Sequence, residues 1–317
     1  MPLSVAEYLG QRTDNNFSNI IPSNFGGKIT PTCPFSGVSC SKLKSKNPSH
    51  PVCSVRDQNN RPFIVCADRL IPSKANALSA SHIAALAAVA QVVLPLSKNH
   101  EIGYKRQVSI SYAKRRRLVL DYVIRLSPKA NSNILRTNII LEVQGGGETS
   151  STGWITRHIS HWASHEKPTN EFLSKQLNTE YLQELRNEGK TPVNVPGIIP
   201  NNAWKRQLDQ ILKKVVLARK YNGAFAIVLG EVLYDYVQNT LSVGGDYFSE
   251  WEIAIIGIAE TKSVDSESIR FDKIYKSVFM TYEEFIAALQ GFKVPDNVKN
   301  PFLGEFTTFR NENFLVE

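Results

Sequence analysis

The chain has 317 residues, which is long enough for one large domain or two smaller ones with buried cores. A hydrophobic content of 42% and a charged content of 21% are typical of an ordinary soluble globular protein. The net charge of +8 favours an anionic partner, and nucleic acid is the commonest one for a basic protein. The first residues contain no apolar core, and the longest apolar run, residues 83–96, is too short to span a bilayer. We therefore expect neither a signal peptide nor a membrane segment.

All four cysteines of the chain lie within one short segment, at positions Cys33, Cys40, Cys53 and Cys66. Without a secretory signal, reducing conditions are expected, and there such a cluster is more often a metal site than a set of disulfides. Thiolates suit zinc or iron in a closed tetrahedral site, which is structural because no coordination position stays open for catalysis. The segment is rich in Pro, Ser, Asn and Lys and poor in core residues, so a metal would supply part of its folding energy. Replacement of one thiolate by His50, buried thiols and disulfides are the alternatives.

Three strands and a helix are expected next along the chain. The segment Ser79-Ala80-Ser81 is placed to cap a helix that runs to about Ala90. Alternation of apolar and polar residues predicts a strand over residues 107–112. After a basic run, residues 118–126 (LVLDYVIRL) and residues 139–144 (IILEVQ) predict two further strands. The turn-like connection between these two strands indicates a hairpin or an adjacent pair.

The second half of the chain also mixes helices and strands. The elements expected there are a polar helix over residues 171–187, an extended linker over residues 191–200, an amphipathic helix over residues 203–221, strands over residues 224–229 and 251–258, and a last helix that begins with a capping box of Thr281 and Glu284. The fold class is therefore mixed α/β.

Two carboxylates lie inside apolar strands, Asp121 in the second strand and Glu142 in the third. Burying a carboxylate is costly unless it is paired, hydrogen-bonded or bound to a metal. If the two strands are neighbours, both carboxylates converge and can hold a hard cation such as Mg²⁺. Gln144 lies on the same side of its strand as Glu142 and could orient a metal-bound water. This arrangement suits phosphodiester hydrolysis, while pairing of each carboxylate with a nearby arginine is the alternative.

Three glycines, residues 145–147, follow Gln144 directly. Because glycine has no Cβ, the backbone there could come close to a bulky ligand such as DNA. The motif therefore adds a possible DNA-facing turn to the pair of carboxylates.

Three motifs occur in a fixed order along the chain. TCPF is followed by three further cysteines and closed by CADR (residues 66–69), the strand with Asp121 is followed by Glu-Val-Gln (residues 142–144), and NNAWKRQLDQILKKVVLARKYNGAFAIVLGEVLYDYV spans residues 201–237. This combination resembles the NotI-like type II restriction endonucleases, from roughly residue 30 to residue 240. That family is a branch of the PD-(D/E)xK nucleases, whose core is a mixed sheet flanked by helices.

The resemblance implies a domain plan and a set of metal ligands. It implies a small N-terminal region with a four-cysteine metal-binding domain (residues 1–78) and a catalytic nuclease domain (residues 79–317). Cys33, Cys40, Cys53 and Cys66 would hold a structural iron, with zinc as the other possible metal. Asp121 and Glu142 would bind the catalytic Mg²⁺ with the Val143 carbonyl, and Gln144 would take the place of the usual lysine. Leu120 replaces the proline of the motif name, and Gln107 is the nearest equivalent of an upstream acidic residue.

By the same resemblance, the protein would be a type II restriction endonuclease that cleaves double-stranded DNA at a specific palindromic site. It would act as a homodimer in the cytoplasm of a prokaryotic cell, away from membranes, beside a cognate DNA methyltransferase. The residues that we expect at the DNA are Lys105, Arg106, Lys114, Arg115, Arg116, Gly145, Gly146, Glu148 and Arg157. The alternatives are one subunit of a heterodimeric cutter or nickase, and a non-catalytic DNA-binding protein with a structural four-cysteine site.

Overall fold

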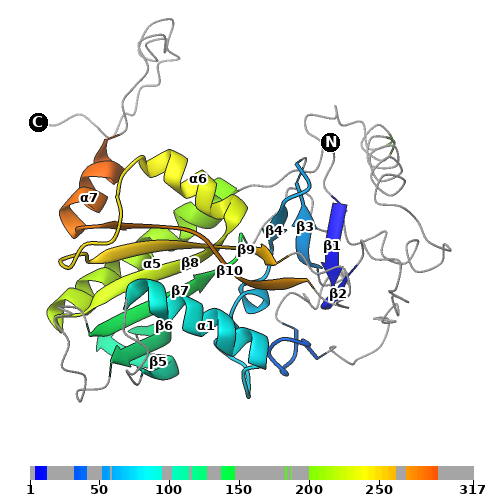
Figure 1. The fold of residues 1–317 in the computed structure, drawn as a ribbon, viewed down its shortest axis with the longest axis horizontal. Coiled ribbons are helices and arrows are strands. Elements are labelled where there is room, and N and C mark those ends of the chain that lie inside the picture. The colour runs from blue at the N-terminus through cyan, green and yellow to red at the C-terminus, as the bar shows by residue number, and fades with distance from the viewer. Residues whose placement is uncertain are drawn as a thin grey trace, which may run out of the picture.

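The computed structural model describes residues 4–12, 32–40, 52–57, 59–94, 102–113, 116–126, 137–146, 200–261 and 269–291, together with Gln183 and Asn187. These residues form a six-stranded sheet flanked by helices and a smaller four-stranded sheet beside it (Figure 1). None of the helices in these ranges is long and apolar enough to cross a membrane. The expected helix at 171–187, the expected linker and residues 127–136 lie almost wholly outside the described residues.

The large sheet is mixed, and its strand order is β10-β9-β8-β7-β6-β5. Its strands are β5 (Ile102–Ala113), β6 (Arg116–Leu126), β7 (Asn138–Gln144), β8 (Ala224–Gly230), β9 (Ile253–Thr261) and β10 (Arg270–Met280). The three central strands, β7 to β9, run parallel, whereas the outer pairings are antiparallel. All seven residues of β8 are buried, as expected for a central strand covered on both faces. The mixed α/β class is confirmed.

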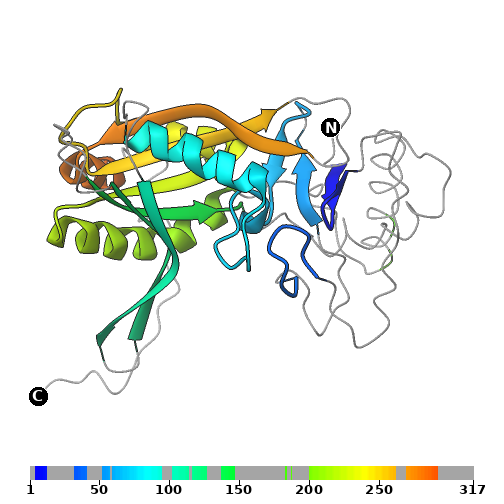
Figure 2. The same cartoon turned by 60° about the horizontal axis from the view of Figure 1, so that its bottom comes forward.

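Helices cover both faces of the large sheet (Figure 2). On one face lie α5 (Pro200–Lys220), α6 (Glu231–Leu241) and α7 (Tyr282–Gln290), and on the other lies α1 (Ala80–Val93). The expected caps are confirmed at two helices. The Ser79 side chain accepts a hydrogen bond from the His82 backbone N–H, and Thr281 and Glu284 form the capping box of α7.

The β5–β6 hairpin extends past the edge of the sheet, as Figure 2 shows in teal. β6 pairs with β7 from Arg125 to Tyr122, but its pairing with β5 continues to Arg116. The outer part of the hairpin therefore parts from β7 at the level of Asp121. We call residues 102–113 and 116–126 together the hairpin arm.

The smaller sheet contains part of the cysteine segment and has the order β2-β1-β3-β4. Its strands are β1 (Ser4–Tyr8), β2 (Gln11–Arg12), β3 (Val52–Arg56) and β4 (Pro62–Ile64). Val55 and Phe63 are fully buried in the same apolar cluster as α5 and α6, and Ile64 belongs to the cluster under α1. This packing corrects the expectation that the cysteine segment is poor in core residues, because its hydrophobic side chains complete both cores of the large sheet.

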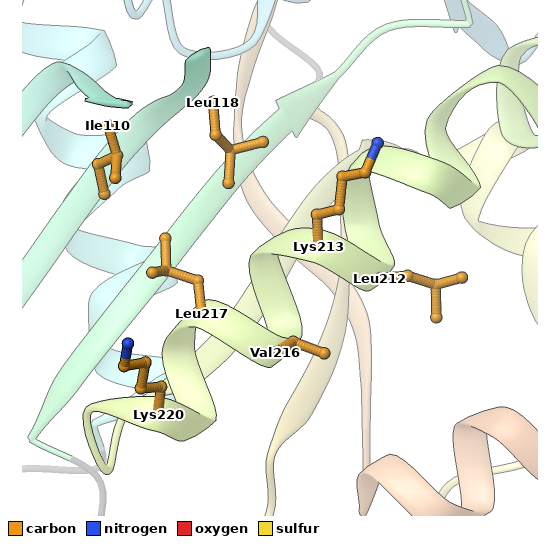
Figure 3. Close-up of a pocket in the computed structure, with 7 residues that line it drawn as sticks. All are labelled: Ile110, Leu118, Leu212, Lys213, Val216, Leu217 and Lys220. Atoms are coloured by element: carbon orange, nitrogen blue, oxygen red, sulfur yellow. The ribbon is translucent and has the colours of Figure 1, made fainter. Parts of the chain in front are cut away.

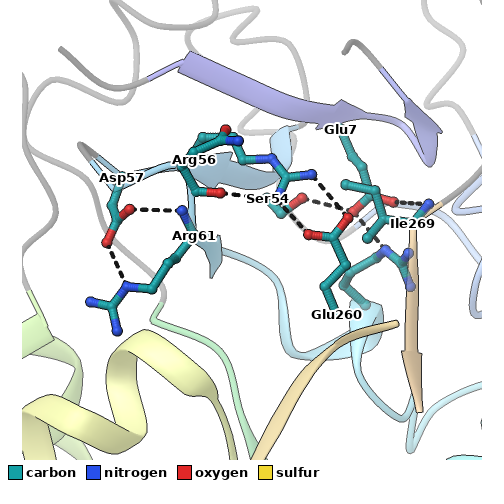
Figure 4. A network of polar contacts seen from close by, with 9 residues as sticks. Glu7, Ser54, Arg56, Asp57, Arg61, Glu260 and Ile269 are labelled. Carbon is teal, nitrogen blue, oxygen red and sulfur yellow. Dashed lines mark hydrogen bonds and ion pairs between the residues drawn. The ribbon is translucent and has the colours of Figure 1, made fainter. Parts of the chain in front are cut away.

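A buried ion pair between Glu7 of the smaller sheet and Arg69 lies against β10 (Figure 4). Glu7 is fully buried and accepts hydrogen bonds from Ser54 Oγ at 2.7 Å, from Arg69 Nε at 2.6 Å and from the Ile269 backbone N–H at 3.3 Å. The Arg69 guanidinium lies over the rings of Phe35 and Phe271, 4.5 Å from each centroid. Four segments that are distant in the sequence are thus tied together at one carboxylate.

Two further ion pairs connect the β3–β4 hairpin to the large sheet and its helices. Arg56 binds Glu260 of β9 through two hydrogen bonds, and Arg61 binds Asp57 (Figure 4). Arg61 also binds Asp235 on α6. These contacts hold the β3–β4 hairpin against β9 and α6.

Candidate active site

Asp121 and Glu142 lie opposite each other on neighbouring strands. The last paired residues of β6 and β7 are Tyr122 and Leu141, and the antiparallel register places the two carboxylate-bearing residues one step further. The backbone N–H of Val143 donates a hydrogen bond to Asp121 Oδ2 at 3.1 Å, which brings the side chain across to β7. The expectation that these two strands are neighbours is confirmed.

Asp121 is held by two more donors from other segments. Ser73 Oγ lies 3.0 Å and Gln107 Nε2 lies 3.1 Å from Asp121 Oδ1, and Gln107 Nε2 also donates to Ser73 Oγ at 2.7 Å. Gln107 has a φ of 48°, a left-handed conformation that costs about 1–3 kcal/mol for a residue with a side chain. Gln107, which the resemblance compares with an upstream acidic residue, therefore contacts Asp121 as a hydrogen-bond donor.

Glu142 is buried and forms an ion pair with Lys214 of α5. Burial raises the pKa of Glu142 to about 7, the charge of Asp121 adds to this rise, and the Lys214 ammonium opposes it. Lys214 is itself only 1% exposed. The partner of Glu142 is therefore a lysine from a helix, in place of the arginines that were the alternative from the sequence.

The end of β7 packs against the protein's own interior. Gln144 Nε2 donates to the Gly145 carbonyl at 2.5 Å, and the Gly146 N–H donates to the Ile64 carbonyl at 2.6 Å. A Cβ on Gly145 would lie 2.7 Å from Ala67 N, and one on Gly146 would lie 1.9 Å from the Phe63 ring. Contact of these glycines with DNA stays a prediction, but intramolecular packing alone explains why both are glycine.

An open, basic hollow of about 580 Å³ lies beside Asp121. It is lined by Ser73, Lys74, Ala75, Lys105, Arg106, Gln107 and Val108. The two residues that donate to Asp121 Oδ1, Ser73 and Gln107, belong to its wall, so the carboxylate lies at its edge. Exposed Lys74 and Lys105 give the hollow a charge that suits phosphate.

The other residues predicted at the DNA have mixed outcomes. Arg106 donates to the backbone carbonyls of Ala75 at 2.6 Å and Asn76 at 3.3 Å, so its guanidinium holds the neighbouring loop to β5. Lys114, Arg115, Glu148 and Arg157 lie outside the described residues, as does the Arg116 side chain. Their contacts with DNA stay predictions.

An apolar groove separates α5 from the hairpin arm (Figure 3). It has a volume of about 390 Å³ and is lined by Ile110, Leu118, Leu212, Val216 and Leu217, with Lys213 and Lys220 beside them. A second hollow of about 510 Å³ shares Ile110 and Leu217 and continues it towards Tyr221. Because the lining is apolar, the groove does not suit a phosphate backbone.

All four cysteines lie within the described ranges, and all are thiols that form no disulfide. Cys53 and Cys66 are adjacent, since the Cys66 N–H donates to the Cys53 carbonyl at 3.2 Å. Burial, and next the charges of Glu7 and Cys66, raise the pKa of the Cys53 thiol. Among the residues that the structure describes, no three His, Cys, Asp or Glu side chains are grouped to hold a metal. The four-cysteine iron site stays a prediction.

The carboxylate pair fits a divalent cation in its chemistry. Asp121 and Glu142 offer hard, charged oxygens, which Mg²⁺ prefers, and it usually binds one or two carboxylates while keeping several waters. Burial is the main cause of the raised Glu142 pKa, and the nearby charge of Asp121 contributes to it. Comparison with models of protein families gives no match, and comparison with curated proteins gives none either.

Proposed function

We propose that this protein is a Mg²⁺-dependent endonuclease that cleaves double-stranded DNA at a specific site. The observation that carries the proposal is the opposed pair Asp121 and Glu142, at the point where the hairpin arm parts from β7. The basic hollow beside Asp121 supports it, because a phosphodiester needs positive charge close to the reacting atoms.

The chain's own residues have separate tasks in this reaction. Ser73 and Gln107 fix Asp121, Lys214 holds Glu142, and Lys74 and Lys105 bind the DNA backbone in the hollow. When bound, the divalent cation supplies neutralisation of phosphate charge and a lower pKa for an attacking water. The six-stranded mixed sheet with helices on both faces accords with a PD-(D/E)xK core. The structural iron, the homodimer and the cognate methyltransferase belong to the same proposal and rest on the resemblance in sequence.

The test is cleavage of long DNA of known sequence by the purified protein with Mg²⁺. We expect discrete fragments that share one end sequence. Asp121→Asn and Glu142→Ala should each lower the rate by more than the roughly 10- to 100-fold loss typical of residues that only support metal ligands. Asp209→Asn is the matched control, because Asp209 is an exposed carboxylate on α5 whose side chain is 71% accessible. Equal cleavage by Asp121→Asn and the wild type would refute the assigned site.

One observation favours a non-catalytic DNA-binding protein as the second candidate. Asp121 already accepts three hydrogen bonds and Glu142 already has a cationic partner, so both carboxylates are satisfied by the protein itself. DNA binding without cleavage in Mg²⁺ or Mn²⁺, on several long substrates, would establish this candidate. Discrete cleavage that Glu142→Ala abolishes would exclude it.

A further inference from the structure

We propose that Lys214 is a positioning residue of the carboxylate site, which fixes Glu142 for a divalent cation shared with Asp121. The inference rests on the proposed metal site and adds a residue from a different part of the chain. The Lys214 ammonium binds Glu142 through Oε2. A carboxylate has two oxygens with about four lone-pair positions. A hydrogen bond at Oε2 therefore leaves other lone pairs that can coordinate a cation.

The position of Lys214 on α5 sets it apart from the other lysines of that helix. It lies on the stripe formed by Ile211, Val215 and Ala218, all of which are buried against the large sheet. Lysine is almost never fully buried without a partner, because desolvation of the ammonium costs several kcal/mol. The adjacent Lys213 is exposed and pairs with Asp209 on the helix surface.

Stability alone does not explain a lysine at this position. Replacing a buried ion pair by apolar residues of similar volume is often neutral or stabilising, so a leucine on α5 facing an apolar residue on β7 would pack at least as well. The buried ion pair therefore carries a desolvation cost. A functional need for a charged and fixed Glu142 accounts for that cost. A metal ligand meets that condition, since a carboxylate binds a cation only when it is ionised.

The charges of the site balance when Lys214 is included. A divalent cation and one ammonium carry three positive charges in total. Asp121, Glu142 and a single phosphodiester carry three negative charges. Without Lys214 the two carboxylates would cancel the charge of the cation, and only the lysines of the hollow would offer positive charge to the phosphate during attack. The ammonium of Lys214 and the divalent cation are therefore both needed to match the negative charges of the two carboxylates and the phosphodiester.

The test is the affinity of the DNA-free protein for Mn²⁺, measured by titration calorimetry. Lys214→Met keeps an unbranched side chain, shorter by one atom, and removes its charge. We expect Mn²⁺ to bind about 10- to 100-fold more weakly, as is usual when a residue that orients a ligand is lost. Lys214→Arg retains the charge and should restore part of the affinity. Lys213→Met, the neighbouring exposed lysine, should bind Mn²⁺ as the wild type does. Wild-type affinity in a folded Lys214→Met variant would overturn the proposal and leave a purely structural ion pair.

Further outcomes keep the two proposals distinguishable. If Lys214→Met does not fold, Lys214→Gln retains a donor without the charge, and wild-type Mn²⁺ affinity in that variant would equally overturn the role of Lys214. Absence of Mn²⁺ binding by the wild type would overturn the metal site and both proposals with it. The expected loss of Mn²⁺ affinity, in a protein that cuts no DNA, would support Lys214 and refute the nuclease.

Discussion

Gly145→Ala should destabilise the protein strongly, although it adds a single methyl group. The new Cβ would lie 2.7 Å from Ala67 N, 2.9 Å from the Cys66 carbonyl carbon and 2.9 Å from the Val65 carbonyl oxygen. All three are backbone atoms, which cannot rotate away as a side chain can. Either the end of β7 or the turn at residues 65–67 must therefore shift, and that turn ends two residues before Arg69 of the buried Glu7–Arg69 ion pair.

The expected loss follows from the cost of overpacking. Extra methyl groups in a well-packed core cost about 1–3 kcal/mol, and we expect about 3 kcal/mol because the clash is with backbone. At about 2 °C per kcal/mol for a large domain, the melting temperature should fall by about 6 °C or more. Differential scanning calorimetry of the variant and the wild type at the same pH measures this directly.

Gly245→Ala is the matched control for this substitution. A Cβ on Gly245 would meet nothing within 4 Å, so its melting temperature should stay close to that of the wild type. If Gly145→Ala also melts within about 1 °C of the wild type, well inside the shift for 1 kcal/mol, the packing argument is refuted. Loss of DNA binding at unchanged stability would instead support the interpretation that Gly145 faces the DNA.

Two further predictions concern buried charges. Glu7→Gln leaves the buried Arg69 guanidinium without its carboxylate, so the free energy of unfolding in urea should fall by about 3–5 kcal/mol, and a loss below about 1 kcal/mol would contradict the assigned ion pair. The second prediction is a pH dependence from Glu142, whose pKa is raised from 4.5 to about 7 in the folded protein. The folded state then binds a proton more tightly than the unfolded state, so this contribution to stability is complete below pH 4.5 and is lost as the pH rises to about 7. It amounts to at most about 3 kcal/mol, and Glu142→Gln should remove it from the pH profile of unfolding; identical profiles would show that the pKa of Glu142 is the same in the folded and unfolded protein.

Elements with short-range signals were predictable from the sequence. The cap at Ser79 and the capping box at Thr281 each depend on residues three positions apart, and both occur as expected. β8 is a continuous apolar run, and its central position follows from burial on both faces. The pairing of β6 with β7 was predictable because the connection between the two strands has a turn-like composition.

Other elements had no comparable signal. β10 lies at the edge of the sheet, and its residues alternate irregularly between exposed and buried, so its sequence lacks a clear period of two. α6 begins directly at the end of β8, and Gly230 at its N-cap offers no side-chain hydrogen bond, so the boundary has no capping residue. The smaller sheet depends on pairing between β1 and β3, whose residues are about fifty positions apart in the chain.

The site combines residues whose proximity no local spacing reveals, since Ser73, Gln107 and Lys214 come from three separate segments. Of these three residues, Lys214 has a signal in the sequence. Lys214 falls on the apolar stripe of an amphipathic helix, where a charged side chain must either be buried or displace the helix. A buried lysine needs an acidic partner, and Glu142 is a carboxylate inside an apolar strand that needs a cation. Matching the two unsatisfied charges predicts that α5 packs on β7 with these residues in contact, which is the arrangement that the structure contains.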